Sequence, residues 1–300
     1  MRRKTTKGIQ LQYYGDKKKI EQDIRHGAFF MTNHRDIVMD ATWLTFLLRT
    51  RYFIHPYFGI GNNLFGKWWI EHLVRFLRAF VVIRNGGFRD QVNNATTLSQ
   101  YIRHLRKRHK SIWLAQREGR AKDGNDVTQP GVLKMLTIDA EDFFESVKEL
   151  NICPVSISYE FDPCDYLKAR EMQLKRDKPD WKKSRKDDLV AMSVGIQGYK
   201  GRIVYRLTPS INHDLDRALT ENPELLQLSR NEQIQYVCNL INQHIHAAYE
   251  IYERGEKFDR YIQGQLAKIN LSNKDEDFLR EKLYEMYNNQ VKNYEKTQLA

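Results

Sequence analysis

The sequence predicts an α/β fold, in which helices flank a mixed central sheet and a helical extension follows. Short runs rich in Val, Ile, Phe and Tyr alternate with longer helical patterns over the first 210 residues. This alternation is typical of a sheet covered by helices. Beyond residue 210 the strand patterns stop while helical patterns continue. We therefore expect an α/β domain over residues 1–210 and a helical C-terminal extension over residues 211–300.

Five short segments have the β-branched and aromatic composition of strands. They are residues 28–32, 79–83, 111–115, 152–159 and 202–207. Longer segments are predicted to be helices, because apolar residues recur on one face or at spacings of three and four. They are residues 89–108, 131–149, 229–253 and 274–296. Residues 163–190 are dense in charge, so we expect an exposed helix and loop that interrupts the sheet.

The chain carries an excess of positive charge. Its 300 residues include 49 Lys and Arg against 38 Asp and Glu, a net charge of +11. Such an excess favours acidic partners, which are phosphates, an anionic membrane surface, nucleic acid or an acidic carrier protein. No signature of a nucleic-acid-binding fold is present, so we expect no nucleic-acid partner.

The cysteines and the apolar stretches indicate the compartment. Cys153, Cys164 and Cys238 show no regular spacing, which argues against a disulfide framework and a zinc site and fits a reducing cytoplasm. The basic N-terminus is not followed by an apolar run, so we expect no signal peptide. The apolar stretches are too short for a membrane span, so any action on lipid is expected from the membrane surface.

Three predicted strands end in polar clusters. These clusters are TNHRD (32–36), IRNGG (83–87) and AQREGRAKDGND (115–126). Function in an α/β sheet tends to lie beyond the carboxyl ends of the strands, and the ends of parallel neighbours meet in one crevice. Such a crevice would hold one histidine, several carboxylates and at least four arginines.

His34 is the candidate general base of this crevice. A carboxylate can bind the proton of one ring nitrogen while the other nitrogen accepts a proton from substrate. Arg84, Arg117 and Arg120 suit a phosphate, because a guanidinium binds two oxygens at once. No Ser or Cys occupies a strained, Gly-flanked turn, so a covalent acyl-enzyme is not indicated. Each residue alone is common at an ordinary strand end, but together they predict activation of a hydroxyl on a phosphate-bearing molecule.

Four motifs across residues 28–160 resemble, in order, those of the glycerolipid acyltransferases, which act on glycerol-3-phosphate or 1-acylglycerol-3-phosphate. NHRDIVMD resembles the family's Asn-His-x4-Asp, FVVIR its apolar strand ending in Arg, AQREGR its Glu-Gly-Thr-Arg block without the Thr, and ICPVSI its Pro-containing strand. Five residues separate His34 from Asp40, one more than in the family. Either Asp40 or Asp36 could therefore partner the histidine, and the apolar residues before Asp40 favour Asp40.

The resemblance implies a mechanism and a location. His34, oriented by Asp40, would deprotonate a glycerol hydroxyl, which would attack the thioester of acyl-CoA or acyl carrier protein. The residues that would hold the glycerol phosphate are Arg84, Glu118, Gly119 and Arg120, and Pro154 would help to shape the site. No metal or cofactor is expected. Phospholipid synthesis would take place in the cytoplasm, peripherally on the anionic inner face of the membrane, with residues 64–80 as a candidate contact or, alternatively, a core helix.

Two other functions are compatible with parts of the sequence. An N-acyltransferase that makes an acyl-amino acid or aminolipid would keep the histidine base, although the arginines argue for a phosphate. A non-catalytic protein could bind an anionic membrane through the basic segments 103–110 and 182–186. This last function leaves the three strand-end clusters unexplained.

Overall fold

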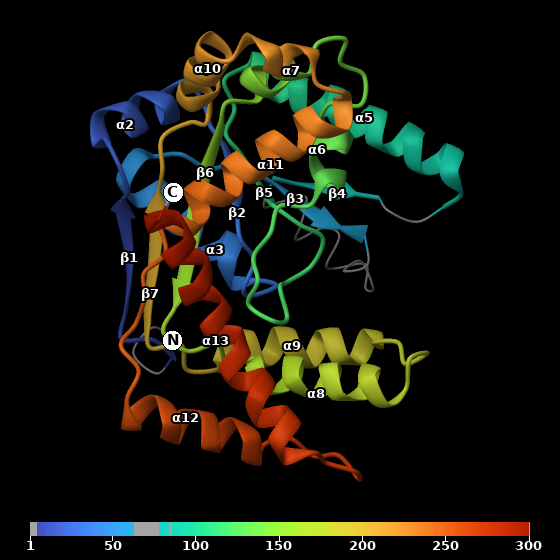
Figure 1. Ribbon diagram of the computed structural model, residues 1–300, viewed down its shortest axis with the longest axis vertical. Helices are drawn as coiled ribbons and strands as arrows, with labels where there is room; N and C mark the ends of the chain where they lie inside the picture. Colours follow the sequence, from blue (N-terminus) through green and yellow to red (C-terminus); the bar gives the residue numbers. More distant parts are fainter. Residues whose placement is uncertain (1–4, 63–77, 84–85, 300) are drawn as a thin grey trace.

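A computed structural model of the protein describes residues 5–62, 78–83 and 86–299. Within these residues one mixed sheet has the strand order β1-β7-β6-β2-β5-β3-β4 (Figure 1). The strands are β1 (Gly8–Tyr13), β2 (Phe29–Thr32), β3 (Tyr57–Gly61), β4 (Ala79–Val82), β5 (Ile112–Ala115), β6 (Ile152–Tyr159) and β7 (Arg202–Leu207). From β6 to β4 all neighbours are parallel, whereas β7 is antiparallel to β6 and parallel to β1. The predicted α/β fold with a mixed sheet is confirmed.

All five predicted strands form, and the sequence analysis missed β1 and β3. The β3 sequence YFGIG contains two glycines, which weaken a strand pattern. Packing explains the first of them, because a Cβ on Gly59 would lie 2.7 Å from Leu114 Cδ1 and 3.0 Å from Phe80. A strand that passes this close to its neighbours needs glycine, and that requirement is invisible in a local pattern.

Helices cover the sheet and continue to the C-terminus. They are α2 (Lys17–Arg25), α3 (Met39–Tyr52), α5 (Phe88–Lys107), α6 (Pro130–Leu136), α7 (Phe143–Leu150), α8 (Asp165–Asp177), α9 (Arg185–Gln197), α10 (Asn212–Glu221), α11 (Arg230–Ala247), α12 (Glu256–Ala267) and α13 (Glu276–Gln298), with a 3₁₀ turn η2 (Pro223–Gln227). The single helix predicted over 131–149 is wrong. It divides into α6 and α7, because Asp142 caps a new start by accepting a hydrogen bond from the Glu145 backbone.

The predicted exposed segment 163–190 is a helical hairpin of α8 and α9. It interrupts the sheet between β6 and β7, as expected. Its inner surface, however, is buried, including Lys168, Ala169 and Ala191. The hairpin lies below the sheet beside α13 (Figure 1), and α8 packs against both α12 and α13. The sequence analysis missed this buried face because the segment is dense in charged residues.

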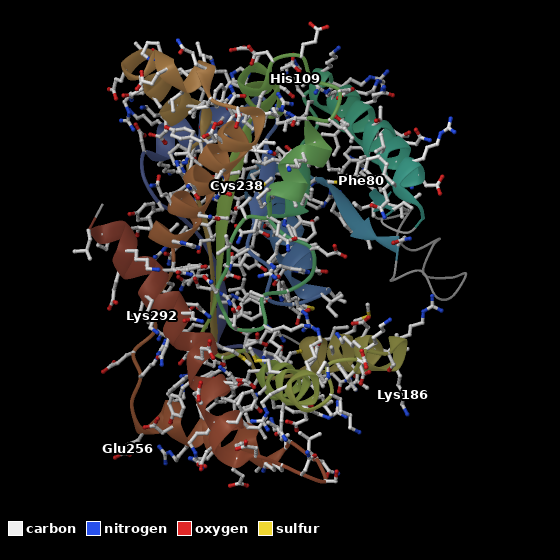
Figure 2. All side chains as sticks on the ribbon, turned by 45° about the vertical axis from the view of Figure 1, so that its right-hand side comes forward. Phe80, His109, Lys186, Cys238, Glu256 and Lys292 are labelled. Atoms are coloured by element: carbon white, nitrogen blue, oxygen red, sulfur yellow. The ribbon has the colours of Figure 1, made fainter. Side chains whose placement is uncertain are left out.

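The two faces of the sheet have separate cores. In β2, Phe29 and Met31 face α5, α6, α7, α10 and α11, whereas Phe30 faces α2 and α3, because side chains alternate along a strand. Helices from beyond residue 211 therefore share a core with the central strands. Figure 2 shows this packing, with Cys238 of α11 inside the molecule and Lys186 of α9 at the surface.

A helix that spans a membrane must be long and predominantly apolar. None of the helices in residues 5–62, 78–83 and 86–299 is both long and apolar enough to cross a bilayer. The candidate membrane contact at 64–80 lies almost entirely outside the described residues, as does Arg84.

Candidate active site

The first polar cluster forms the turn between β2 and α3. The chain leaves β2 at Thr32 and enters α3 at Met39, so Asp40 lies in the first helical turn. This turn brings His34 back over the helix start, and its Nδ1 lies 2.8 Å from Asp40 Oδ2. Asp40 is completely buried, whereas the His34 side chain is 13% exposed. Of the two carboxylates that sequence allowed, Asp40 is therefore the one that contacts the histidine.

Asp40 is held by donors on both of its carboxylate oxygens. Oδ2 also accepts hydrogen bonds from the backbone N–H groups of Arg35 (2.6 Å) and Asp36 (2.9 Å), and Oδ1 accepts from the Tyr159 hydroxyl (2.9 Å). Burial, and next the charge of Asp40, raises the pKa of Tyr159 well above its usual value, so this hydroxyl stays a donor. Because the Asp40 oxygen accepts these hydrogen bonds, a neutral His34 ring would donate to it from Nδ1 and keep a lone pair on Nε2.

Asp36, the other candidate partner, has a structural position. Its Oδ1 accepts from the backbone N–H groups of Val38 and Met39, both at 2.9 Å, at the start of α3. Its Oδ2 has no hydrogen-bond partner among the described residues and faces Gly195 of α9. Burial, and next the charge of Asp40, raises the pKa of Asp36. The side chain thus connects the turn between β2 and α3 to the hairpin and makes no hydrogen bond to the histidine.

Asn33 and Arg35, which the sequence analysis did not single out, anchor the same turn. The Asn33 side chain makes two hydrogen bonds to the backbone of Ile157 in β6, donating at 3.0 Å and accepting at 2.8 Å. Arg35 forms a fully buried ion pair with Asp126 in the third polar cluster. Tyr249, just beyond α11, donates to the same Asp126 oxygen at 2.7 Å. These contacts hold the turn between β2 and α3, residues 33–38, which we call the site turn, against β6, the 115–126 loop and the C-terminal part of the chain.

A cavity of about 1180 Å³ opens beside His34. Its apolar wall comes from α3, β3, β5 and α9 and includes Val38, Phe58, Ile60, Trp113, Met192 and Ile196. The Trp113 ring also meets the His34 ring edge-on, with centroids 6.1 Å apart and planes at 70°. An apolar wall and an aromatic ring therefore lie beside the histidine.

The third polar cluster reaches the same cavity. Glu118, Gly119 and Arg120 line it together with His34, as does Arg117. Gly119 has a φ of +66° with nothing near its Cβ position, so glycine here serves the turn. The structure thus brings together His34, Glu118, Gly119 and Arg120, with Asp40 behind the histidine. Arg84 lies outside the described residues, and Pro154 lies inside β6.

Sequence reasoning missed the contribution of the α8–α9 hairpin. Lys168 and Glu171 of α8 and Met192 of α9 line the cavity, although they are more than 130 residues from His34. Lys168 is paired with Asp162, with Nζ 2.6 Å from Oδ2. No local pattern links these residues to the site, and the mixed charge of the segment favoured a solvent-exposed interpretation.

The site combines the His34–Asp40 pair with a partly apolar cavity that carries charged side chains of both signs. Among the residues that the structure describes, no group of three or more His, Cys, Asp or Glu side chains is arranged to hold a metal. The cysteines are unpaired and buried. Comparison with models of known protein families finds no match, and a search of curated proteins finds no significant similarity.

Proposed function

We propose that the protein transfers a fatty acyl group from a thioester, acyl-CoA or acyl carrier protein, to a hydroxyl of glycerol-3-phosphate or 1-acylglycerol-3-phosphate. The observation that carries this proposal is the His34–Asp40 pair, 2.8 Å apart, at the wall of a large cavity that also contains Arg120. The ordered motifs that resemble those of the glycerolipid acyltransferases support the same reaction. Such a transfer is a step of phospholipid synthesis.

In the proposed reaction His34 acts through Nε2. This nitrogen takes the proton of the acceptor hydroxyl, and the resulting oxygen attacks the thioester carbonyl. As the carbon–sulfur bond breaks, the proton passes from His34 to the leaving thiolate. Asp40 holds the ring in the required tautomer and stabilises the imidazolium that forms between the two steps.

The cavity suits an acyl donor with an apolar chain and an acceptor with a phosphate group. Its volume of about 1180 Å³ and its apolar wall can hold an acyl chain. Glu118, Gly119 and Arg120 would hold the glycerol phosphate, with Arg84 as a further proposed ligand. The arginine suits this role because a guanidinium can bind two phosphate oxygens at once.

We propose that the reaction takes place at the cytoplasmic face of a membrane, because its products carry acyl chains. The net charge of +11 favours an anionic surface. Ile83 and Phe88, at the end of β4 and the start of α5, are exposed apolar side chains. Together these features support peripheral binding, with the acyl chain reaching the cavity from the bilayer surface.

The test is acyl transfer by the purified protein from labelled acyl-CoA and acyl carrier protein to the two acceptors, side by side. We expect His34→Ala to lower the rate by a factor of about 10² to 10⁴. The matched control is His213→Ala, because His213 lies 3.1 Å from Asp23 in another His–Asp pair and does not line the cavity. Circular dichroism checks that both variants fold.

Two results would overturn the proposal. One is no transfer with any donor and acceptor pair, and the other is equal transfer by the folded His34→Ala protein. An amine acceptor is included as a third arm. Transfer to the amine alone would identify the N-acyltransferase instead.

A further inference from the structure

Arg120 lines the cavity and has a guanidinium nitrogen without a hydrogen-bond partner among the described residues. This nitrogen, Nη1, is buried. A guanidinium has five N–H donors and no acceptor, so the unpartnered nitrogen needs an acceptor atom, and a phosphate supplies several. Buried polar groups without a partner are uncommon in folded proteins, and this one points to a ligand that brings acceptor oxygens.

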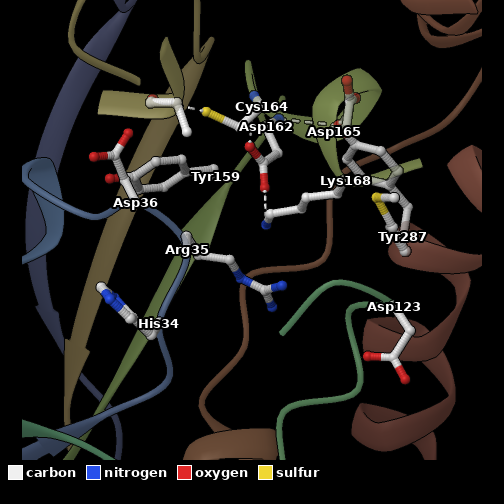
Figure 3. A network of polar contacts seen from close by, with 12 residues as sticks. His34, Arg35, Asp36, Asp123, Tyr159, Asp162, Cys164, Asp165, Lys168 and Tyr287 are labelled. Atoms are coloured by element: carbon white, nitrogen blue, oxygen red, sulfur yellow. Dashed lines mark hydrogen bonds and ion pairs between the residues drawn. The ribbon is translucent and has the colours of Figure 1, made fainter. Parts of the chain in front are cut away.

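Lys168 of α8 lines the same cavity, but its amino group is paired. The Lys168 side chain is only 4% exposed, and Nζ lies 2.6 Å from Asp162 Oδ2. Figure 3 shows the lysine reaching Asp162, while the Arg35 side chain extends away from His34. The other Asp162 oxygen accepts from the Cys164 backbone at 2.9 Å. The carboxylate is therefore fixed by the backbone on one oxygen and by the lysine on the other.

Lys168 and Arg120 both act on the Asp162 charge. Burial alone would raise the pKa of Asp162, but Lys168, then the hydrogen bond from the Cys164 backbone, and to a smaller extent Arg120 outweigh burial and lower it. Two cations that line the cavity therefore both lie near the single carboxylate of Asp162. Lys122, which also lines the cavity, is already paired with Glu171 of α8.

We propose that Lys168 and Arg120 together bind a phosphate group, and that Asp162 occupies the Lys168 amino group until a phosphate arrives. A phosphate offers the same acceptor oxygens as the carboxylate, and the flexible lysine stem can turn from one to the other. The choice of glycerol-3-phosphate as the natural ligand rests on the proposed function. Phosphate binding itself requires no acyl donor.

The test measures binding directly, by isothermal titration calorimetry of the full chain with inorganic phosphate and with glycerol-3-phosphate, in the absence of thioester. Lys168→Gln should weaken binding of both by about tenfold or more, because a charge-assisted hydrogen bond is lost. Lys175→Gln is the matched control. Lys175 lies on the same helix, is half exposed and does not line the cavity, so this change should alter binding less than about twofold.

Asp162→Asn separates a phosphate-binding lysine from a purely structural one, because only the first predicts a change in phosphate affinity. If Asp162 competes with phosphate, removing its charge frees Lys168, and binding should tighten by about threefold or more. Weaker or unchanged binding by Asp162→Asn would overturn the competition, and unchanged binding by Lys168→Gln would overturn the role of the lysine. Lys168→Gln leaves the Asp162 carboxylate buried without its cation and could prevent folding. In that case the double variant Asp162→Asn/Lys168→Gln replaces it, and it should bind phosphate about tenfold or more weakly than Asp162→Asn.

The phosphate-binding measurement and the acyl-transfer assay test the two proposals separately. Phosphate binding that depends on Lys168, without any acyl transfer, would overturn the proposed reaction and leave this binding site standing. Acyl transfer by the wild type with phosphate binding unaffected by Lys168→Gln would overturn the binding role alone.

Discussion

Asp165, the first residue of α8, is predicted to destabilise the protein at neutral pH. Burial, and next the charge of Asp162, raises the pKa of Asp165 to about 7 from its ordinary 3.8. In the folded protein Asp165 keeps its proton up to about pH 7, whereas in the unfolded chain it loses the proton near pH 4. Replacing it by asparagine, which never ionises, should therefore stabilise the protein at neutral pH.

The magnitude follows from the difference between the two pKa values. A pKa difference of about 3, at about 1.4 kcal/mol for each unit, corresponds to about 4 kcal/mol. Because the folded-state pKa of this carboxyl is raised, its contribution to the free energy of unfolding falls as pH rises from 4 to 7 and is constant above. The gain from Asp165→Asn should be about 1.6 kcal/mol at pH 5 and reach about 4 kcal/mol above pH 7.

The contacts of Asp165 allow the replacement. Oδ1 accepts from the Tyr166 backbone at 2.6 Å and from Gln265 at 2.5 Å, and asparagine keeps this oxygen. Oδ2 faces the Tyr287 hydroxyl at 2.9 Å, whose oxygen can accept from the new amide. The variant therefore loses the ionisable group with little change in shape.

The assay is urea unfolding of the wild type and Asp165→Asn at several pH values from 5 to 8. Asp277→Asn, an exposed position on α13, is the control and should change the free energy of unfolding by less than about 0.5 kcal/mol. A gain that does not vary with pH, or a variant less stable than the wild type at pH 8, would refute the reasoning.

Three further predictions concern the site turn. Asp40→Asn should lower acyl transfer by a factor of about 10² to 10⁴, because the histidine loses the carboxylate that fixes its tautomer; a steady-state rate within a factor of two of the wild type would contradict this. Arg35→Ala should lower the free energy of unfolding by about 3 to 5 kcal/mol, since it leaves Asp126 buried and unpaired, and recovery in the double variant Arg35→Ala/Asp126→Asn, measured in urea, checks the cause. Gly195→Ala should cost about 1 to 3 kcal/mol, because its Cβ would lie 2.1 Å from Asp36 Oδ2, and a melting temperature equal to that of the wild type would exclude this contact.

Local patterns were sufficient for most of the sheet. The strands at 28–32 and 152–159 are buried on both faces, and their largely apolar runs are visible without tertiary information. The β3 strand was missed because two glycines weaken its pattern, and Gly59 is required by neighbours more than 20 residues away in the sequence. The single helix expected over 131–149 divides at an Asp cap, a signal that was present in the sequence and outweighed by the apolar periodicity.

For the candidate site, too, some features could be predicted from local sequence, whereas others depend on contacts between distant segments. Sequence by itself determined that a histidine, two carboxylates and several arginines follow the ends of predicted strands, because strand ends and side-chain types are local properties. Only the tertiary structure decided that Asp40, and not Asp36, contacts His34, since the path of a turn between strand and helix depends on what holds it, here Asn33 and Arg35. Likewise, only the fold brings Lys168 to the cavity, because contacts across more than 130 residues leave no periodic trace in the chain.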